Sequence, residues 1–117
     1  MVDRDPSCLF CRIVADEIPS DRVYEDEDVV AFRDIAPRAP THVLAIPRRH
    51  VPDAHSLTHD DAELLAKLFS ALRAVADREG LGGGYRIVTN VGADAGQTVF
   101  HLHLHLLGGR PMSWPPG

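Results

Sequence analysis

The chain of 117 residues is long enough for one domain with a modest core, and its apolar fraction of 44% is typical of a globular protein. A formal net charge of −5 argues against polynucleotide binding, which needs a basic face, whereas a small nucleotide requires only local donors. No apolar run approaches the length of a transmembrane helix, and the first five residues lack the basic and apolar regions of a signal peptide. We therefore expect a cytoplasmic protein that binds neither nucleic acid nor membrane.

The N-terminal segment combines a short helix with a pair of cysteines. Residues 1–6 are charged and expected to be frayed, and Ser7 can cap a helix that runs to about Ala15. Cys8 and Cys11 form a Cys-x-x-Cys pair, for which a metal or redox role is favoured over a disulfide in a reducing cytosol. One such pair is a weak signal, and two buried free cysteines are the alternative.

Three strands are predicted next. Residues 23–25 and 29–32 flank the acidic residues 26–28, which we expect at a solvated hairpin tip. Asp34 follows, and its carboxylate either caps the proline-containing loop or accepts two ribose hydroxyl protons. His42 opens an apolar strand at 43–47 that ends at two arginines, expected to be solvated, and His50.

A long helix is predicted from the N-cap Thr58 to about Glu79, with two early acidic residues placed favourably against the helix dipole. Its apolar residues follow three-and-four spacing and predict one buried stripe: Leu65, Leu68, Phe69, Leu72, Val75 and Ala76. A strand at 85–90 should pair with the histidine-rich segment that follows the loop 91–96. The small residues of that loop allow backbone N–H groups to approach a phosphate closely.

Residues 101–106 alternate histidine with leucine, which is typical of a half-buried strand. Phe100, Leu102, Leu104 and Leu106 should face a core, and the three histidines should share the other face. Same-face neighbours are about 6.6 Å apart and the outer two about 13 Å, whereas zinc needs nitrogen ligands at about 2.0–2.1 Å. The three histidines therefore cannot all bind one metal, and a division of roles along a cleft is favoured.

The run His101-Leu102-His103-Leu104-His105-Leu106-Leu107 resembles the signature of the histidine triad (HIT) superfamily of nucleotide hydrolases and transferases. The resemblance covers nearly the whole chain. It includes Asp34-Ile35, Pro40-Thr41-His42, the segment 46–50, Asn90 and Gly96-Gln97-Thr98. The ending 108–117 resembles the Hint branch, whose members hydrolyse nucleoside phosphoramidates.

This resemblance implies an α+β, HIT-like fold with an antiparallel sheet of about five strands, one long helix and a short N-terminal helix. It implies one HIT domain over residues 1–117 and a homodimer in which two sheets join side by side. The tail 108–117 should lie near the active site of the partner subunit, where Trp114 could cover the leaving-group side of the pocket.

The resemblance also assigns roles to side chains. His103 would be a nucleophile whose second ring nitrogen is held by a backbone carbonyl, His105 and His42 would contact phosphate oxygens, and Thr98, where Hint proteins commonly have serine, would protonate a leaving amine. Substrate-binding residues would be Leu9, Phe10, Phe32, Asp34, Ile35, Asn90, Gly96, Gln97 and Trp114. A structural Zn²⁺ would be held by Cys8, Cys11, His50 and His101, a soft, closed set of four ligands.

The leading interpretation is a hydrolase of purine nucleoside 5′-phosphoramidates, adenosine preferred, acting through a nucleotidylated His103. One alternative is a dinucleoside polyphosphate hydrolase or phosphorylase of the same superfamily. The other is a nucleotide-binding, zinc-stabilised interaction module with little turnover.

Overall fold

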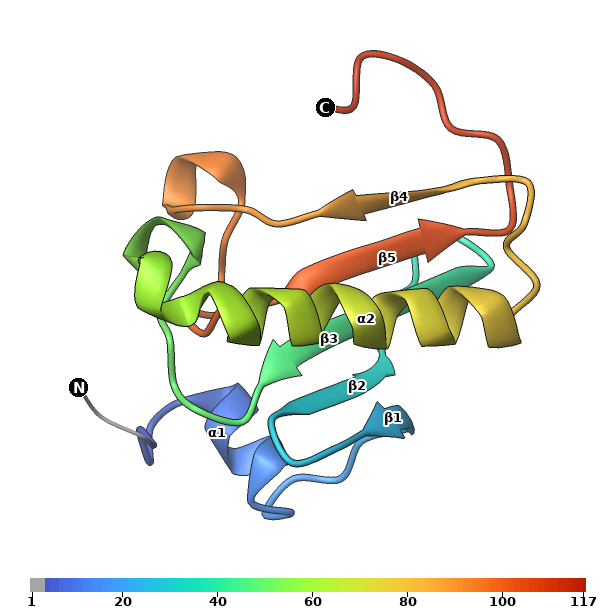
Figure 1. The fold of residues 1–117 in the computed structure, drawn as a ribbon. Coiled ribbons are helices and arrows are strands. Elements are labelled where there is room, and N and C mark those ends of the chain that lie inside the picture. Colours follow the sequence, from blue (N-terminus) through green and yellow to red (C-terminus); the bar gives the residue numbers. More distant parts are fainter. Residues whose placement is uncertain (1–3) are drawn as a thin grey trace.

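The computed structural model describes residues 4–117, which form one antiparallel sheet with a long helix on one face and a short helix on the other (Figure 1). The five strands lie in the order β1-β2-β3-β5-β4, so that β1 and β4 are the edges. The α+β fold expected from the sequence is confirmed. The elements are α1 (Leu9–Val14), β1 (Arg22–Glu25), β2 (Val29–Arg33), β3 (Thr41–Pro47), α2 (Ala62–Arg78), β4 (Tyr85–Val88) and β5 (Leu104–Gly108), with single 3₁₀ turns at Ala54–Ser56, His59–Asp61 and Ala93–Ala95.

The central strand β3 divides the core into two halves. Its side chains alternate between the faces of the sheet, so that Val43 and Ala45 pack under α2, whereas Leu44 and Ile46 pack with α1. All seven residues of β3 are buried, as expected for a strand covered on both sides. The α2 side holds the larger cluster, and the α1 side is the one that receives the histidines. No helix within residues 4–117 has both the length and the apolarity needed to cross a membrane.

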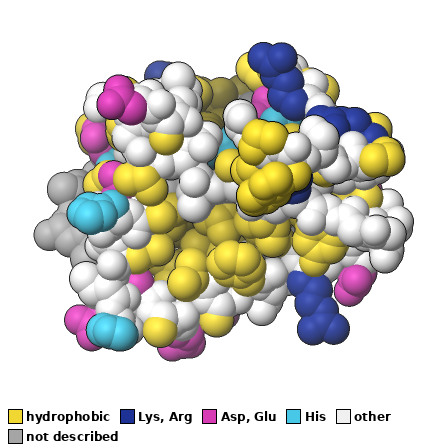
Figure 2. Space-filling view, turned by 90° about the horizontal axis from the view of Figure 1, so that it is seen from above, with side chains coloured by type: hydrophobic (Ala, Val, Ile, Leu, Met, Phe, Trp, Pro, Cys, Tyr) yellow, Lys and Arg dark blue, Asp and Glu magenta, His cyan; other side chains and the backbone are white. Residues whose placement is uncertain are grey.

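Helix α2 departs from the sequence prediction at its start and on one flank. Thr58 caps a 3₁₀ turn in a capping box with Asp61, and the α-helix itself begins at Ala62. Leu68 and Leu72 are fully buried, but Leu65 and Phe69 are 38% and 46% exposed, so the buried stripe is narrower than predicted. Figure 2, which looks down on the β4 edge, shows apolar side chains gathered across this face. Leu65 and Phe69 line a groove of about 740 Å³ between α2 and the strands β4 and β5.

The N-terminal helix α1 is capped by Cys8 and not by Ser7. The Cys8 side chain accepts a hydrogen bond from the backbone N–H of Cys11, whereas Ser7 donates both its N–H and its hydroxyl to Asp5. The expected frayed segment 1–6 lies partly outside the described residues. Because α1 starts at a cysteine, both cysteines of the pair are held at the same end of the helix.

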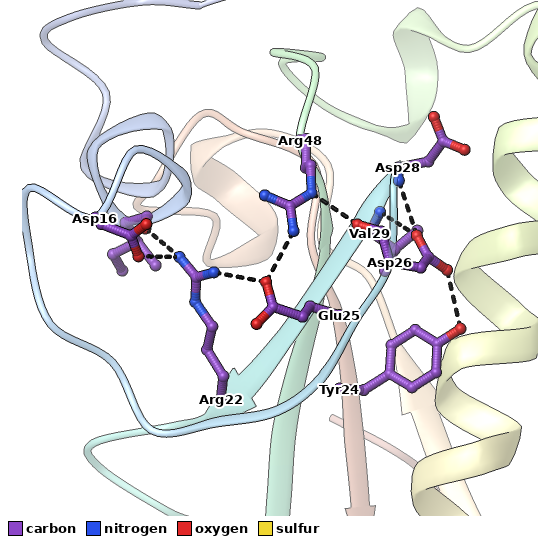
Figure 3. A network of polar contacts seen from close by, with 9 residues as sticks. Asp16, Arg22, Tyr24, Glu25, Asp26, Asp28, Val29 and Arg48 are labelled. Atoms are coloured by element: carbon purple, nitrogen blue, oxygen red, sulfur yellow. Dashed lines mark hydrogen bonds and ion pairs between the residues drawn. The ribbon is translucent and has the colours of Figure 1, made fainter.

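The hairpin between β1 and β2 is ordered by its own carboxylate (Figure 3). One oxygen of Asp26 accepts two backbone N–H groups of the turn, and the other accepts the Tyr24 hydroxyl at 2.9 Å. Arg48 donates to the Asp26 carbonyl at 2.8 Å, and Arg49 pairs with Asp61. Both arginines were expected to be solvated, but both are half-buried and paired, and they fix the end of β3 that leads into His50.

The histidine segment is a regular strand only in its second half. Strand β5 begins at Leu104, and Phe100, expected in the core, is 52% exposed. The ladder between β3 and β5 ends at the pair Ala45 and Leu104 because Pro47, further along β3, has no N–H to donate. The alternation nonetheless persists, since Leu102 and Leu104 pack under α2 while His103 and His105 lie on the other face.

Candidate active site and metal cluster

The ring of His103 is fixed in position and in protonation state. Its Nδ1 lies 2.7 Å from the carbonyl oxygen of His101, so this nitrogen carries the proton and donates it. The edge of the ring packs against Phe10, with centroids 5.1 Å apart at 88°. The Nε2 atom is therefore left with a free lone pair, and the backbone acceptor expected from the sequence is present.

A chain of hydrogen bonds sets the protonation of His42 and His105. The backbone N–H of Arg38 donates to His42 Nδ1 at 3.0 Å, so the proton of neutral His42 is on Nε2. That Nε2 lies 2.9 Å from His105 Nδ1, which must then accept, and the proton of His105 is on its own Nε2. Asp34 Oδ2 also lies 3.4 Å from His42 Nε2. His105 consequently presents an N–H group at its outer nitrogen.

Burial keeps these two rings neutral. Desolvation lowers the pKa of His105 to about 4, with the neighbouring His103 and His42 acting in the same direction. Desolvation also lowers the pKa of His42, against the opposing effect of the Asp34 carboxylate. Asp34, His42 and His105 are close enough to hold a metal ion, but the proton on His42 Nε2 occupies the lone pair that a metal would need. The group works as a hydrogen-bond relay.

A cavity of about 430 Å³ opens beside His103 and His105 on the α1 face of the sheet. Its size lies within the range of pockets that bind small molecules. Helix α1 and strands β2 and β3 supply a mostly apolar wall, which Asp34, Ile35, Thr98 and Val99 complete. Ile35 is fully exposed there and Leu9 is 44% exposed, so both can cover a bound ring.

Most of the predicted catalytic and substrate-binding residues meet in this cavity. Those that line it are Leu9, Phe10, Phe32, Asp34, Ile35, Thr98, His103 and His105. His42 lies behind His105 and reaches the cavity only through it, although the resemblance implies direct phosphate contact for both. Asn90, Gly96, Gln97 and Trp114 do not form its wall.

The side chain of Gln97 is fully engaged by the backbone. It is 3% exposed, its Oε1 accepts from Gly92 N–H at 2.8 Å, and its Nε2 donates to the carbonyls of Pro52 and Val99. The Gln97 side chain therefore shapes the loop 91–99, and the phosphate contact expected from the sequence stays a prediction. Gly96 closes the same loop at a φ of 97°, which favours glycine.

The tail leaves the sheet beyond β5 and is tied back at two points, one of which is the bond from the Arg110 side chain to the carbonyl of Arg38 at 3.0 Å. Arg86 on β4 donates to the carbonyl of Ser113 at 2.8 Å, and Trp114 beyond it is 82% exposed. Within residues 4–117 this tryptophan is not part of the cavity wall.

Sequence reasoning missed six residues of the cavity wall and the identity of both backbone groups that fix the histidines. The missed residues are Ile13, Ile18, Pro19, Arg33, Leu44 and Val99. Ile13 was detectable, because it lies three positions after Phe10 on one helical face, and Leu44 lies two positions after His42 on one strand face. The Arg38 N–H and the His101 carbonyl have no sequence signal, because every residue but proline supplies both groups.

Four potential metal ligands from three separate segments converge next to the cavity. The ligand atoms of Cys8, Cys11, His50 and His101 all lie within 4.8 Å of one another. Their sulfur–nitrogen distances are 3.4 Å for Cys8 to His101, 3.3 Å for Cys11 to His50 and 3.5 Å for Cys11 to His101. Tetrahedral zinc, with bonds of about 2.3 Å to sulfur and 2.0–2.1 Å to nitrogen, places such neighbours about 3.5 Å apart.

The surroundings of the cluster also suit a dication. His101 Nε2 lies 2.8 Å from the carbonyl of Pro47 and donates to it, which leaves Nδ1 free as a ligand, and burial lowers its pKa to about 4. The two sulfurs accept backbone N–H groups, Cys8 from Cys11 and Cys11 from Asp5, each at 3.4 Å. Burial raises the pKa of the Cys11 thiol, a cost that a bound cation offsets by stabilising the thiolate.

Comparison with known proteins agrees with this architecture. The family model described as HIT domain matches residues 15–112. An uncharacterised HIT-like protein of Synechococcus elongatus is 50% identical over 109 residues, covering 93% of this chain and 96% of the relative.

Among solved structures, a HIT family hydrolase from Legionella pneumophila superposes with a TM-score of 0.93 at 52% identity, covering 95% of this chain and all of the other. A HIT family hydrolase from Clostridium thermocellum gives 0.91 at 46% identity, covering 93% of this chain and 96% of the other.

Proposed function

The chain belongs to the HIT-domain family, and we propose that within this family it is a nucleoside phosphoramidase. It would hydrolyse the P–N bond of purine nucleoside 5′-phosphoramidates, adenosine preferred, to the nucleoside monophosphate. The observation that carries the proposal is the locked ring of His103, whose free Nε2 borders a nucleoside-sized cavity beside the N–H of His105. The HIT family hydrolases among the similar structures support a hydrolase.

The reaction would take two steps. His103 Nε2 attacks phosphorus while the P–N bond breaks, and the departing amine takes a proton from the hydroxyl of Thr98, which lines the cavity. Water then attacks the nucleotidyl-histidine and gives one proton back to the Thr98 oxygen, which releases the monophosphate and returns both His103 and Thr98 to their neutral forms. The hydrogen bond from Nδ1 to His101 strengthens as the ring gains positive charge during attack.

The relay through His42 would aim a donor at the phosphate. Because His105 is held with its proton on Nε2, it is ready to stabilise negative charge developing on the phosphate oxygens without reorienting. The neutrality of His105 matters as well, because a second charged ring beside the nucleophile would raise the cost of forming a cationic His103.

The rest of the cavity would hold the nucleoside. The edge-to-face rings of Phe10 and Phe32, 5.6 Å apart, form an apolar wall for the base, and Leu9 and Ile35 would close over it. One oxygen of Asp34 accepts the N–H of Ala36, which orients the carboxylate and leaves the other oxygen available to ribose hydroxyls. The loop that contains Asn90 and Gly96 would reach the phosphate from outside the cavity wall.

The cysteine–histidine cluster would hold a structural zinc ion. Cys8, Cys11, His50 and His101 supply all four positions of a tetrahedral site, so no position remains for a catalytic water. Zinc there would tie α1 to the end of β3 and to the segment before β5. A cytoplasmic location, as expected from the sequence, would keep both cysteines reduced and able to bind the metal.

The groove between α2 and β4 would be the homodimer interface. It is lined by Leu65, Phe69 and Ile87, and it lies beside β4, an edge strand with unpaired backbone groups. Side-by-side association of two β4 strands would cover both features in one step. A second copy of the chain would also bring the exposed Trp114 of one subunit towards the site of the other.

Turnover of an adenosine 5′-phosphoramidate by the purified protein tests the proposal. Rapid-quench mass spectrometry should reveal an adenylyl adduct on His103. In His103→Gly nucleotide affinity should persist while turnover falls by roughly 10⁴–10⁶. Faster cleavage of dinucleoside polyphosphates would assign the chain to the sibling class of enzymes, and binding without turnover would make it an interaction module. Turnover with inversion at phosphorus and no adduct would reduce His103 to a general base.

A further inference from the structure

A second cavity adjoins the first on the far side of Leu9, Thr98 and Val99. It measures about 420 Å³, and these three residues line both cavities. Its remaining walls are formed by Asp5, Ser7, Phe100 and two residues of the metal cluster, Cys8 and His50. The proposed binding of base, ribose and phosphate uses none of this space.

The position of Thr98 indicates which part of a substrate would enter the second cavity. If Thr98 gives its proton to the departing nitrogen, that nitrogen lies at the boundary between the two cavities. Any substituent on the nitrogen then continues away from His103 into the second cavity. This step rests on the proposed phosphoramidase activity, and it adds the identity of the leaving group.

The lining of the second cavity has apolar side chains and one carboxylate. Leu9 and Phe100 are 44% and 52% exposed, and both face this cavity, where an alkyl chain would cover them. Asp5, which is half-buried, also lines this cavity. The Asp5 carboxylate, two exposed apolar side chains and Thr98 therefore line one and the same cavity.

The carboxylate of Asp5 has an oxygen to spare. Both the N–H and the hydroxyl of Ser7 bind the same oxygen, Oδ1, at 2.9 and 2.7 Å. Within residues 4–117 no lysine or arginine forms an ion pair with Asp5, and its Oδ2 has no hydrogen-bond partner there. A divalent metal ion held by two thiolates and two neutral histidines would form a complex with no net charge. Asp5 would then give the cavity its negative charge.

We propose that this second cavity binds the leaving amine, and that Asp5 selects alkylamines whose far end carries a positive charge. The ammonium group would pair with Oδ2 of Asp5, while the chain lies on Leu9 and Phe100. The preferred substrates would then be phosphoramidates of diamines or of basic side chains, ahead of equally long neutral alkylamines.

Two adenosine phosphoramidates of matched size test this directly, one with an aminobutyl and one with a pentyl substituent on nitrogen. In the wild type, kcat/KM for the aminobutyl compound should exceed that for the pentyl compound by about 5-fold to 15-fold, as for a partly buried ion pair. Potassium chloride should reduce this ratio, because salt screens the pair. Asp5→Asn keeps an oxygen for Ser7 and should bring the ratio close to one.

Asp77→Asn is the matched control, since it removes one exposed negative charge from α2, on the opposite face of the sheet, and should leave the ratio unchanged. Phe100→Ala should weaken both substituted substrates relative to the unsubstituted phosphoramidate without altering the charge preference. Equal ratios in wild type and Asp5→Asn would overturn the inference.

If the proposed phosphoramidase activity is wrong, the wild type will not turn over the unsubstituted phosphoramidate, and this outcome is distinct from a missing preference for charged amines. In that case calorimetric dissociation constants of the two compounds for His103→Gly decide the inference alone. The aminobutyl compound must bind more tightly than the pentyl compound, and Asp5→Asn in the same background must abolish the difference.

Discussion

The relay behind His105 makes a quantitative prediction for His42→Leu. The substitution removes the donor that holds His105 in one tautomer and one orientation. The lost hydrogen bond is worth about 0.5–1.5 kcal/mol, which corresponds to a decrease in kcat of about 2-fold to 12-fold. In His105→Ala the group that faces the phosphate is itself lost, and a decrease of about 10²–10³ is expected.

A double-mutant cycle separates the relay from direct contact with phosphate. If His42 acts only through His105, adding His42→Leu to His105→Ala should cost no further activity. If His42 touches the phosphate itself, as the family resemblance implies, the two losses should multiply. Single-turnover kinetics on an adenosine phosphoramidate measure the four rates, and nucleotide affinity and thermal melting confirm that each variant is folded. Multiplying losses, or a loss beyond 100-fold in His42→Leu alone, would refute the relay.

Four further predictions follow from other parts of the molecule. Protein purified without chelator should contain about one zinc per chain by elemental analysis, and Cys8→Ser should lose it; metal-free wild type of equal stability would contradict this. Deleting 113–117 should alter the ranking of leaving groups but not nucleotide affinity, and an unaltered ranking would make the tail a mere dimer contact. Phe69→Glu should convert a dimer to a monomer in light scattering at micromolar concentration; a monomeric wild type would remove the dimer from the proposal. Because burial lowers the pKa of His105 to about 4, the unfolded chain takes up this proton first as pH falls below about 6.5, so stability is complete above that pH and is lost towards pH 4. Urea unfolding at pH 7 and pH 5 should therefore differ less in His105→Gln than in the wild type.

Hydrophobic periodicity predicted which helices and strands form better than it predicted where they begin and end. The strands around the acidic turn, the central strand and the long helix all lie where their patterns indicate. Three-and-four spacing did not separate Leu68, which is fully buried, from Phe69, which is half exposed, because both continue one stripe. The alternating pattern likewise predicted a strand that reaches too far towards Phe100. Nothing in residues 96–103 shows that the partner strand β3 lacks a backbone N–H donor at Pro47.

The site was predictable in its residue types and not in its hydrogen bonds. The family motif brought together Cys8 and His101, which are separated by 93 positions, and no local pattern could have paired them. Gln97 carries a motif position too, but its amide is consumed by three backbone groups that only the folded loop supplies. The tautomer of His42 depends on a backbone N–H at position 38, where almost any residue would serve.

Residue 101 contributes both to the metal cluster and to the position of the proposed nucleophile, but it does so through two different groups. The imidazole of His101 faces the metal cluster, whereas its carbonyl holds His103. That carbonyl belongs to the same peptide plane as the N–H of Leu102, which donates to the carbonyl of Val51 at 2.6 Å. The plane is thus clamped from both sides by groups that need no metal. Loss of zinc in Cys8→Ser should therefore lower the melting temperature strongly, while single-turnover rates of the folded fraction stay within about 10-fold of wild type, the loss expected from one weakened orienting contact. A collapse of the chemical step comparable to His103→Gly would show that the metal, and not the peptide plane, positions the nucleophile.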